Sequence, residues 1–532
     1  AVTTRTNWTE GWQLGKPDLV VTLGEPYQLK AEGTDVFRIF VMSLPVQTTR
    51  FVRALEFRPG NPKVVHHANI RIDRTPASRK LDEADPAPGY EGLISRTAQY
   101  PDGHFLGWTP GQVSPLLPKD MAWRLEPGTD LVAELHMQPD GKPERVQPSI
   151  GLFFGDVPPT RTPTMLRLGR QGIDIPAGEK EYVVTDSYLL PVDVEVEAVQ
   201  PHAHYRAHTV HGEATLPDGT KRSLIDIADW DFRWQHVYRF VTPFSLPKGS
   251  TIAMRYVYDN SDENPRNPER PPKRTLWGQR SADEMGDLWV QVLTRDDHDL
   301  AVLERGFRPK VAAEDVIGYE VEIGKHPADV GLHDDAALLY LELGRADDAV
   351  KHFQASLQLK SESAAAHYNL GIALTAARRL RDAAAEYQRA LQVDPNYVKA
   401  HNNLGSVYVA QGRFDDAVRE YREVVRLEPD GASGVANLAW PLATAPSRTP
   451  SDVTEAVGLA TRAAELTRRR DPGVLDVLAA AYAAAGQFEK AVDTTDAALR
   501  LTPPEPLASG IRSRQALYRQ HTTYVATASA PR

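Results

Sequence analysis

From about residue 326 onward the sequence repeats itself at an interval of 34 residues, and this repeat constrains the fold more than any other feature. The recurring positions carry small residues, an aromatic ring and a closing proline. They are Leu370-Gly371, Ala383, Tyr387, Ala390 and Pro395, followed by Leu404-Gly405, Ala417, Tyr421, Val424 and Pro429. Units of this length are typically two helices that cannot bury their apolar faces alone and must stack. We therefore expect an all-α solenoid over residues 326–505.

The pattern resembles the tetratricopeptide repeat, in which small residues let the helices pack closely and a tyrosine fills the space between them. A degenerate copy precedes at Ala349 and Phe353, and two more follow. The first of these needs an insertion at "SRTPSD" to bring Ala456 into register, and the second ends at Pro503. Five repeats, closed by a capping helix near "SGIRSRQALYR" within residues 506–532, form a self-sufficient stack with a concave surface. The resemblance implies a protein or peptide partner on that surface.

Residues 1 to about 300 follow a different pattern, that of β-strands. Short runs such as "DVFRIFVMSL", "DLVAELHMQP" and "TIAMRYVYDN" alternate or cluster apolar residues between proline, glycine and aspartate. Runs of this length predict antiparallel sandwich or barrel architecture. The proline-rich stretch "GDVPPTRTP" at 155–163 marks a boundary, so we expect two β-sandwich domains, at 1–160 and 161–305.

Composition excludes several classes of function. The chain of 532 residues has no cysteine, which rules out disulfides, thiolate metal sites, iron–sulfur clusters and thiol nucleophiles. Any metal must therefore be held by His, Met, Asp or Glu. The net charge of −10 argues against a nucleic-acid partner, and no run of 18 apolar residues is present to form a membrane span.

Histidines gather in three segments of the β-rich part. "VVHHANIRID" carries His66 and His67, "AELHMQP" carries His136, and "QPHAHYRAH" carries His202, His204 and His208. Residues i and i+2 of a strand share a face, so His202 and His204 can approach one ion. Adjacent residues face opposite ways, so His66 and His67 need a bulge or a strong twist to meet. From these residues alone, a metal site and a histidine-rich polar strand both remain open.

These segments and their neighbours resemble, in order, the copper type II, ascorbate-dependent monooxygenases. That family includes peptidylglycine α-hydroxylating monooxygenase and dopamine β-monooxygenase. "DVFRIFVMSLPVQTTRFVRALEFRPGNPKVVHHANI" resembles its first copper-binding segment, "LVAELHMQP" the segment of its third histidine, and "IPAGEKEYVVT" the opening of its second domain. "VQPHAHYRAH" resembles its His-x-His, and "SADEMGDLWVQVLTR" the segment that supplies a copper-binding methionine. The resemblance covers about residues 18–296 and does not extend to the repeats.

The resemblance implies two jelly-roll β domains that hold two copper ions per chain. His66, His67 and His136 would bind the first ion; His202, His204 and Met285 would bind the second and carry catalysis. Imidazole suits copper in both oxidation states, while a thioether favours Cu(I), the state that meets O₂. The implied reaction is hydroxylation of a C–H bond by O₂. The three-histidine site would supply an electron across a solvent-filled cleft, with ascorbate or another one-electron donor as the reductant.

Three residues depart from the family pattern where the substrate would bind. In the peptide-processing members an arginine that clamps the substrate carboxylate occupies the position of Gln200, and Asn and Tyr correspond to Asp287 and Trp289. Glutamine cannot make the charge-assisted bidentate contact of arginine, and Asp287 would repel an anion. We therefore expect an uncharged, amine-bearing or aromatic substrate, either a small molecule or a peptide, rather than a glycine-extended peptide. Trp289 would form a stacking wall and Asp287 would pair with a cation.

Other residues of these types have simpler interpretations. His104, His208, His211, His236 and His298 match no family ligand and are expected to be surface or hydrogen-bonded residues. Met137 and Met254 are expected in the core. Without the resemblance, Glu284 and Asp287 would be interpreted as solvated charges.

Two further functions compete with the monooxygenase. A non-catalytic copper-binding scaffold would use the same fold to handle copper or dock partners, although retention of all six apparent ligands speaks against it. A zinc hydrolase could use three histidines, but no candidate general base lies at a recognisable spacing.

The expected location is extracytoplasmic, in a bacterial periplasm or outside the cell. Two partly exposed copper sites and the fusion of β domains to a solenoid favour it. The first residues, "AVTTRTNWTEGW", lack a signal-peptide pattern and fit either a cytosolic start or a mature end. We expect that a signal peptide has been removed.

Overall fold

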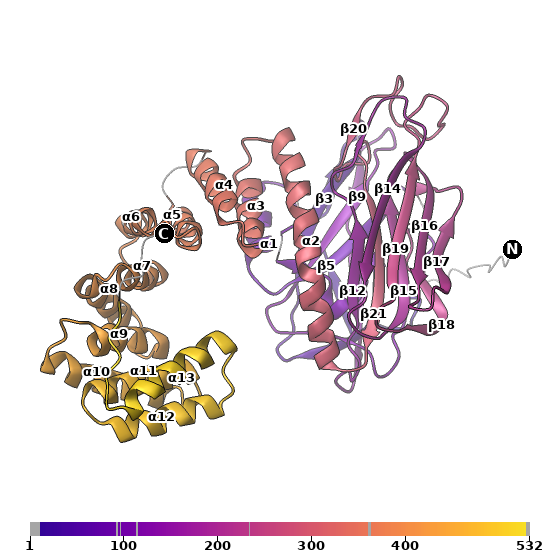
Figure 1. Cartoon of the computed structure of the whole chain (residues 1–532). Coiled ribbons are helices and arrows are strands. Elements are labelled where there is room, and N and C mark those ends of the chain that lie inside the picture. Colours follow the sequence, from indigo (N-terminus) through magenta and orange to yellow (C-terminus); the bar gives the residue numbers. More distant parts are fainter. Residues whose placement is uncertain are drawn as a thin grey trace. The chain divides into compact units, whose positions relative to one another are not determined.

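The structure is a computed structural model that describes residues 11–33, 35–91, 94–95, 97–112, 115–232, 235–359 and 363–527. The chain forms two compact units, Ala1–Glu322, which is mainly β, and Ile323–Arg532, which is helical (Figure 1). Most of the N-terminal segment "AVTTRTNWTEGW" and residues 528–532 of the predicted tail lie outside the described residues.

The first half of the β unit contains two antiparallel sheets. One has the strand order β1 (Leu19–Thr22), β11 (Ser149–Gly155), β4 (Arg50–Arg58), β8 (Trp123–Leu125). The other has the order β3 (Val36–Ser43), β9 (Asp130–Met137), β5 (Val65–Asp73), β6 (Ala98–Gln99), and β7 (Gly107–Trp108) also pairs with β5. A short strand pair, a helix and a 3₁₀ turn complete this half: β2 (Tyr27–Leu29) with β10 (Glu144–Val146), α1 (Ala77–Ala84) and Pro101–Gly103.

The second half also contains two antiparallel four-stranded sheets. One has the order β12 (Thr164–Gly169), β21 (Gly286–Thr294), β15 (Val194–Ala203), β18 (Tyr238–Leu246). The other has the order β14 (Tyr182–Leu189), β19 (Thr251–Tyr258), β16 (Ala207–Thr215), β17 (Lys221–Ile227). A short pair joins β13 (Asp174–Ile175) to β20 (Thr275–Leu276).

The two halves have the same topology. When the eight principal strands of each half are counted along the chain, one sheet has the order first, eighth, third, sixth. The other sheet has the order second, seventh, fourth, fifth in both halves. Each strand of the first half therefore has a counterpart in the second, so that β4 corresponds to β15, β5 to β16 and β9 to β19.

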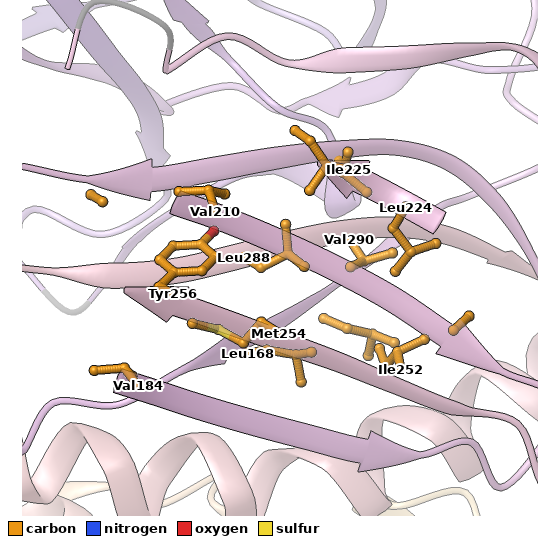
Figure 2. Packing of buried hydrophobic residues seen from close by; sticks show 14 of the residues in the cluster. Leu168, Val184, Val210, Leu224, Ile225, Ile252, Met254, Tyr256, Leu288 and Val290 are labelled. Atoms are coloured by element: carbon orange, nitrogen blue, oxygen red, sulfur yellow. The ribbon is translucent and has the colours of Figure 1, made fainter. Parts of the chain in front are cut away.

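Apolar side chains from both sheets of the second half meet in one buried cluster (Figure 2). Leu168 and Leu288 come from one sheet, and Val210 and Met254 from the other. On each strand the residues that join the cluster alternate with residues of the opposite face, because successive side chains of a strand point to opposite faces of the sheet. Met254 is 2% exposed and Met137, in the core of the first half, is fully buried, so both are core residues as predicted.

A long helix, α2 (Asp297–Lys325), follows the last strand of the β unit. Its Phe307 joins the core of the second half, and its Asp315 and Lys310 form ion pairs with Arg167 of β12 and Asp186 of β14. These strands are the outermost ones of their sheets, so the helix covers edges that would otherwise present unpaired backbone groups. The sequence predicts a β domain that ends at 305 and repeats that begin at 326, whereas α2 begins inside that domain and fills the interval up to residue 325.

In its described ranges, 323–359 and 363–527, the helical unit contains five helix pairs and a final helix. They are α3 (Val330–Glu342) with α4 (Ala346–Leu359), α5 (Ala364–Ala376) with α6 (Leu380–Val393), α7 (Val398–Ala410) with α8 (Phe414–Leu427), α9 (Ala432–Thr444) with α10 (Pro450–Leu466), α11 (Pro472–Ala484) with α12 (Phe488–Arg500), and α13 (Glu505–Arg519).

The packing explains the recurring glycine and tyrosine. A Cβ atom on Gly371 would lie 2.5 Å from the ring of Tyr387, and one on Gly405 would lie 2.7 Å from Tyr421. Each tyrosine therefore fits only because the facing helix has no side chain there. None of the helices in the described ranges has both the length and the apolar character that crossing a membrane requires.

Candidate metal centre

His66, His67 and His136 lie together on neighbouring strands β5 and β9. The ring centroid of His136 is 5.2 Å from that of His66 and 5.0 Å from that of His67. The β5–β9 register shifts at His66: Val65 pairs with Met137, and His67 pairs with the preceding residue of β9, His136. This irregularity is the bulge that two adjacent histidines need in order to approach a common point.

The hydrogen bonds of His136 leave one ring nitrogen available. His136 is 1% exposed, and its Nε2 lies 3.0 Å from Oδ2 of Asp35. Its Nδ1 is buried and has no hydrogen-bond partner among the residues that the structure describes. Phe37 stacks on the imidazole with ring centroids 4.3 Å apart. The hydrogen bond from His136 lowers the pKa of Asp35, so this carboxylate is charged and fixes the ring, as carboxylates commonly do beside metal-binding histidines.

His202 is the penultimate residue of β15, and His204 directly follows the strand's last residue, Ala203. Their ring centroids lie 5.3 Å apart. Nδ1 of His204 is 3.2 Å from the carbonyl oxygen of Asp283, which leaves Nε2 as the nitrogen for a ligand. Met285 precedes β21, the strand that pairs with β15 through Ala203 and Gly286. Because the register ends with this pair, His204 and Met285 are the next residues of two adjacent segments, so the predicted third ligand comes from the segment that neighbours the other two.

Glu284 holds these two strands together. It is fully buried, and its Oε1 accepts hydrogen bonds from the backbone N–H groups of His204 at 2.5 Å and Met285 at 3.0 Å. Its Oε2 accepts one from the N–H of Arg206 at 3.0 Å. Burial raises the pKa of Glu284 to about 7, although these hydrogen bonds oppose the shift. The interpretation of Glu284 as a solvated charge is wrong, because the side chain is buried and bound to backbone N–H groups. The sequence alone could not show this, since these partners depend on which strands pair.

Burial keeps three of the candidate ligands, His67, His202 and His204, uncharged. It lowers the pKa of His202 to about 4 against a hydrogen bond to Gln235, and together with His202 it lowers the pKa of His204 to about 3. Burial, reinforced by His136 and the other nearby histidines, also places the pKa of His67 well below its usual range. Neutral imidazole is the form that binds metal ions.

Phe232 contacts histidines of both groups and was not predicted. Its ring centroid lies 6.2 Å from His67, 5.9 Å from His136 and 5.8 Å from His204. The residue follows β17 in a polar stretch that gives no sequence signal for such a role. A buried phenyl ring therefore touches both histidine groups where the resemblance implied solvent.

The distances between the histidine rings are compatible with two rings binding one metal ion. The donor atoms, however, do not point to a common position. Two imidazoles bound to one ion at about 2 Å have centroids roughly 5 Å apart, close to the values found here. Across the ranges that the structure describes, no three His, Asp or Glu residues are arranged to hold a metal ion. Binding would therefore require ring rotations, and in the second group it also requires the thioether of Met285.

Gln200, Asp287 and Trp289, the predicted substrate residues, lie on the same sheet as His202. Gln200 lines a small cavity together with His67, Asn69, Trp108, Thr109 and Gln235. None of the described residues that line the cavity has a side chain of the Asp, Glu, Lys or Arg type.

Trp289 and Asp287 lie near Arg167. The Arg167 guanidinium is 5.7 Å from the Trp289 ring, and Tyr100 meets that ring edge-on at 5.8 Å. Asp287 is 5% exposed, not solvated as interpreted without the resemblance; burial raises its pKa to about 6, against the charge of Arg167. Asp287 therefore already has a cationic neighbour within the chain.

The remaining histidines lie apart from these groups. His208 is exposed, and His211 lies 3.4 Å from Asp226. Nδ1 of His236 is 2.6 Å from Thr109 Oγ1. His298 is exposed at the start of α2, while His104 is buried, which lowers its pKa to about 4.

The helical unit matches known repeat families. The TPR repeat family matches residues 337–376 and 379–412, and the tetratricopeptide repeat family matches residues 398–430. This part of the chain therefore consists of tetratricopeptide repeats, as the 34-residue period predicted.

Several crystal structures of repeat proteins are similar to part of the chain. MamA from Desulfovibrio magneticus RS-1 is 16% identical with a TM-score of 0.30, over 32% of this chain and 94% of that one. A thermophilic TPR protein from Thermus thermophilus, TTC0263, is 19% identical with a TM-score of 0.30, over 36% and 100%. YrrB, described as a TPR protein with an unusual peptide-binding site, is 19% identical with a TM-score of 0.30, over 37% and 97%. No curated protein matches the chain.

Proposed function

We propose that the β unit is a copper-dependent monooxygenase that binds two copper ions, and that the repeats bind a protein or peptide partner. The observation that carries the proposal is the grouping of the six predicted ligands. The rings of His66 and His67 both lie within 5.2 Å of the His136 ring on β5 and β9. The rings of His202 and His204 lie 5.3 Å apart, and the pairing of Ala203 with Gly286 places their segment beside the one that carries Met285. These segments are far apart in the sequence, so their convergence supports the ligand set that the resemblance implied.

The strand order supports the jelly-roll fold that the resemblance implies. A jelly roll has eight strands in two sheets formed by two Greek keys. Each half of the β unit has eight principal strands in two sheets, and the order is the same in both halves.

The donor atoms fit copper in two different ways. In the first half, the buried and unpaired Nδ1 of His136 supplies a nitrogen beside His66 and His67, an all-imidazole set. In the second half, Met285 adds a soft thioether to His202 and His204, a set that favours Cu(I). Copper would supply O₂ activation and one-electron exchange with ascorbate or a similar reductant. The chain's own contribution is orientation: Asp35 fixes the His136 ring, and Glu284 fixes His204 relative to Met285.

The cavity beside His67 supports an uncharged substrate. Its polar lining consists of amide and hydroxyl groups, including Asn69, Thr109, Gln200 and Gln235, with the indole of Trp108 beside them. Such groups can hydrogen-bond a neutral group and pack an aromatic ring, and among the described lining residues none offers a carboxylate the charged partner that arginine would supply. An extracytoplasmic location, bacterial periplasm or exterior, follows from the copper chemistry and remains part of the proposal.

A second candidate is a non-catalytic copper-binding scaffold. The tetratricopeptide repeats favour it, because stacked repeats serve as binding surfaces. The need for ring rotations before the donors converge also fits a protein that takes up copper without turning over.

Oxygen consumption separates the two candidates. The purified chain is loaded with copper and given ascorbate, and O₂ uptake is followed with pools of neutral aromatic and amide substrates. The monooxygenase predicts two coppers per chain and substrate-dependent uptake that is lost in Met285→Ile. The partly buried Met165 of β12 provides the matched control, and Met165→Ile should keep the uptake. Tight copper binding with no uptake on any pool would favour the scaffold.

A further inference from the structure

The segment that follows α13 runs back across the repeats and docks on the fourth of them (Figure 1). The backbone N–H of Ala526 donates to the carbonyl oxygen of Thr444, the last residue of α9, at 2.9 Å. The guanidinium of Arg448 donates to Thr523 Oγ1 at 3.1 Å. Residues 522–527 thus lie on helices that precede them by about 75 positions in the sequence.

The insertion in the fourth repeat creates this docking surface. In the third and fifth repeats the first helix closes with a tight turn, in which the N–H of Arg413 bonds to Tyr408 and that of Gln487 bonds to Tyr482. In the fourth repeat the chain instead continues through Ala445, and the N–H of Arg448 bonds back to the Ala445 carbonyl. The last carbonyls of a helix lack partners within the helix. Here the docked segment supplies a partner for Thr444.

Tyr524 and Ala526 of the docked segment pack against the repeats, while Val525 between them is exposed, as in an extended peptide. The Tyr524 ring lies 5.7 Å from that of Trp440, and the Arg514 guanidinium lies 5.5 Å from Tyr524. Ala526 is 5% exposed and packs with apolar side chains of the third and fourth repeats, whereas Val525, between the two, is 39% exposed. Alternate side chains of an extended chain point to opposite sides, which accounts for this pattern.

We propose that this surface binds extended, uncharged peptides with an aromatic residue two positions before a small residue, and that residues 522–527 are its resident ligand. The surface, called here the fourth-repeat surface, consists of Phe414, Trp440, Thr444, Ala445, Arg448 and Arg514. The contacts that hold the segment on this surface include the backbone hydrogen bond of Ala526, the side-chain hydrogen bond of Thr523 and the packing of Tyr524 and Ala526. A peptide of the same chemistry can make all of them.

Residues 522–527 compete with any external peptide for the fourth-repeat surface, because they belong to the same chain as that surface. A tethered ligand acts at an effective concentration of about 1 mM, so it excludes an external peptide of comparable intrinsic affinity at micromolar concentrations. A partner protein would have to present its peptide at high local concentration, or bind more tightly, to displace the segment.

Fluorescence anisotropy tests the proposal with a labelled synthetic peptide "QHTTYVAT", which reproduces residues 520–527. The titrated proteins are the full chain and a chain ending at Gln520. We expect saturable binding to the shortened chain and binding at least about tenfold weaker to the full chain. A peptide carrying Tyr524→Ala should bind at least about tenfold more weakly, because it loses the aromatic contact. Val525→Ala is the matched control and should change the affinity by less than about twofold, since that side chain faces solvent.

A second variant keeps the test decisive if shortening the chain unfolds the last repeat. Tyr524→Ala in the full-length chain retains every residue of the solenoid and weakens only the resident ligand. It should bind the labelled peptide more tightly than the unmodified chain does, while its circular dichroism stays unchanged. A folded variant, shortened or full-length, that binds the peptide no better than the unmodified chain would overturn the proposal.

Discussion

The two halves of the β unit share one topology but carry their histidines on different sheets. In the first half they lie on β5 and β9, the fourth and seventh principal strands. In the second half they lie on β15, the third, next to the Met285 segment that leads into the eighth. The same framework therefore presents an all-imidazole group from one sheet and an imidazole–thioether group from the other. The donor set is a property of which sheet carries the residues, not of the fold.

The registers make the comparison residue by residue. On β5, His66 is the residue left out of the pairing with β9, and His67 pairs with His136. On the corresponding strand β16, His208 is the residue left out, and Thr209 pairs with Val257 of β19. The second half thus keeps the bulge and its histidine, but Thr209 and Val257 stand where the first half has His67 and His136. His208, the third histidine of "QPHAHYRAH", is exposed and isolated for this reason.

The largest expected effect is a difference in copper content between variants of the two bulge histidines, His66 and His208. His66→Ala should lower the copper content from two ions per chain to one, because it removes a ligand from a three-ligand site. His208→Ala, its counterpart in the other half, should leave two ions per chain. Metal analysis after gel filtration measures both variants. Equal copper loss in both would break the comparison, because it would make the second bulge a metal site as well.

Replacing Glu284 should lower the stability and the copper affinity of the second half and leave the first half unchanged. Glu284→Ala leaves three buried backbone N–H groups without an acceptor, which should cost about 3 kcal/mol of unfolding free energy. Loss of its hold on His204 and Met285 should reduce copper affinity in the second half roughly 10- to 100-fold and leave the first half unchanged. Glu263→Ala is the control, since Glu263 is 77% exposed and forms a surface ion pair with Lys180. Urea unfolding and competitive copper titration would measure the two effects, and an equal loss of copper from both halves would contradict the assignment.

A smaller effect is expected from the bulge on β15. Glu197 is the residue left out of the pairing there, as Arg53 is on the corresponding strand β4. Burial and the neighbouring Glu195 carboxylate raise the pKa of Glu197 to about 6. Its contribution to stability is therefore fully present below about pH 4.5 and is lost as the pH rises through about 6.

Glu197→Gln should remove this pH dependence. At pH 7 the variant should be more stable than the unmodified chain by about 2 kcal/mol, and at pH 4 the two should be equal. Denaturant unfolding at several pH values provides the measurement. A variant that is less stable at pH 7 would mean that the charged carboxylate stabilises the bulge through Arg161.

The sequence predicted those parts of the site that depend on spacing. The i, i+2 spacing placed His202 and His204 on one face, and the adjacency of His66 and His67 required a bulge. It also placed Met137 and Met254 in the core, because they alternate with residues of the opposite face. What it missed depends on which strands pair. The burial of Glu284 follows from the position of its segment beside β15, and Phe232 reaches the histidines from a loop without periodicity. The helix α2 was missed because its apolar residues face two sheet edges that the sequence does not identify.

The most direct test of the central claim is X-ray absorption spectroscopy on the Cu(I)-loaded chain, because it distinguishes sulfur from nitrogen ligands. Two dissimilar sites predict two coppers per chain and a copper–sulfur component that corresponds to one sulfur for every two coppers. That component should disappear in Met285→Ile and persist in His136→Ala, which retains only the second-half copper. A spectrum with nitrogen ligands alone in the unmodified chain, or a copper–sulfur component that survives Met285→Ile, would contradict the assignment of different donor sets to the two halves.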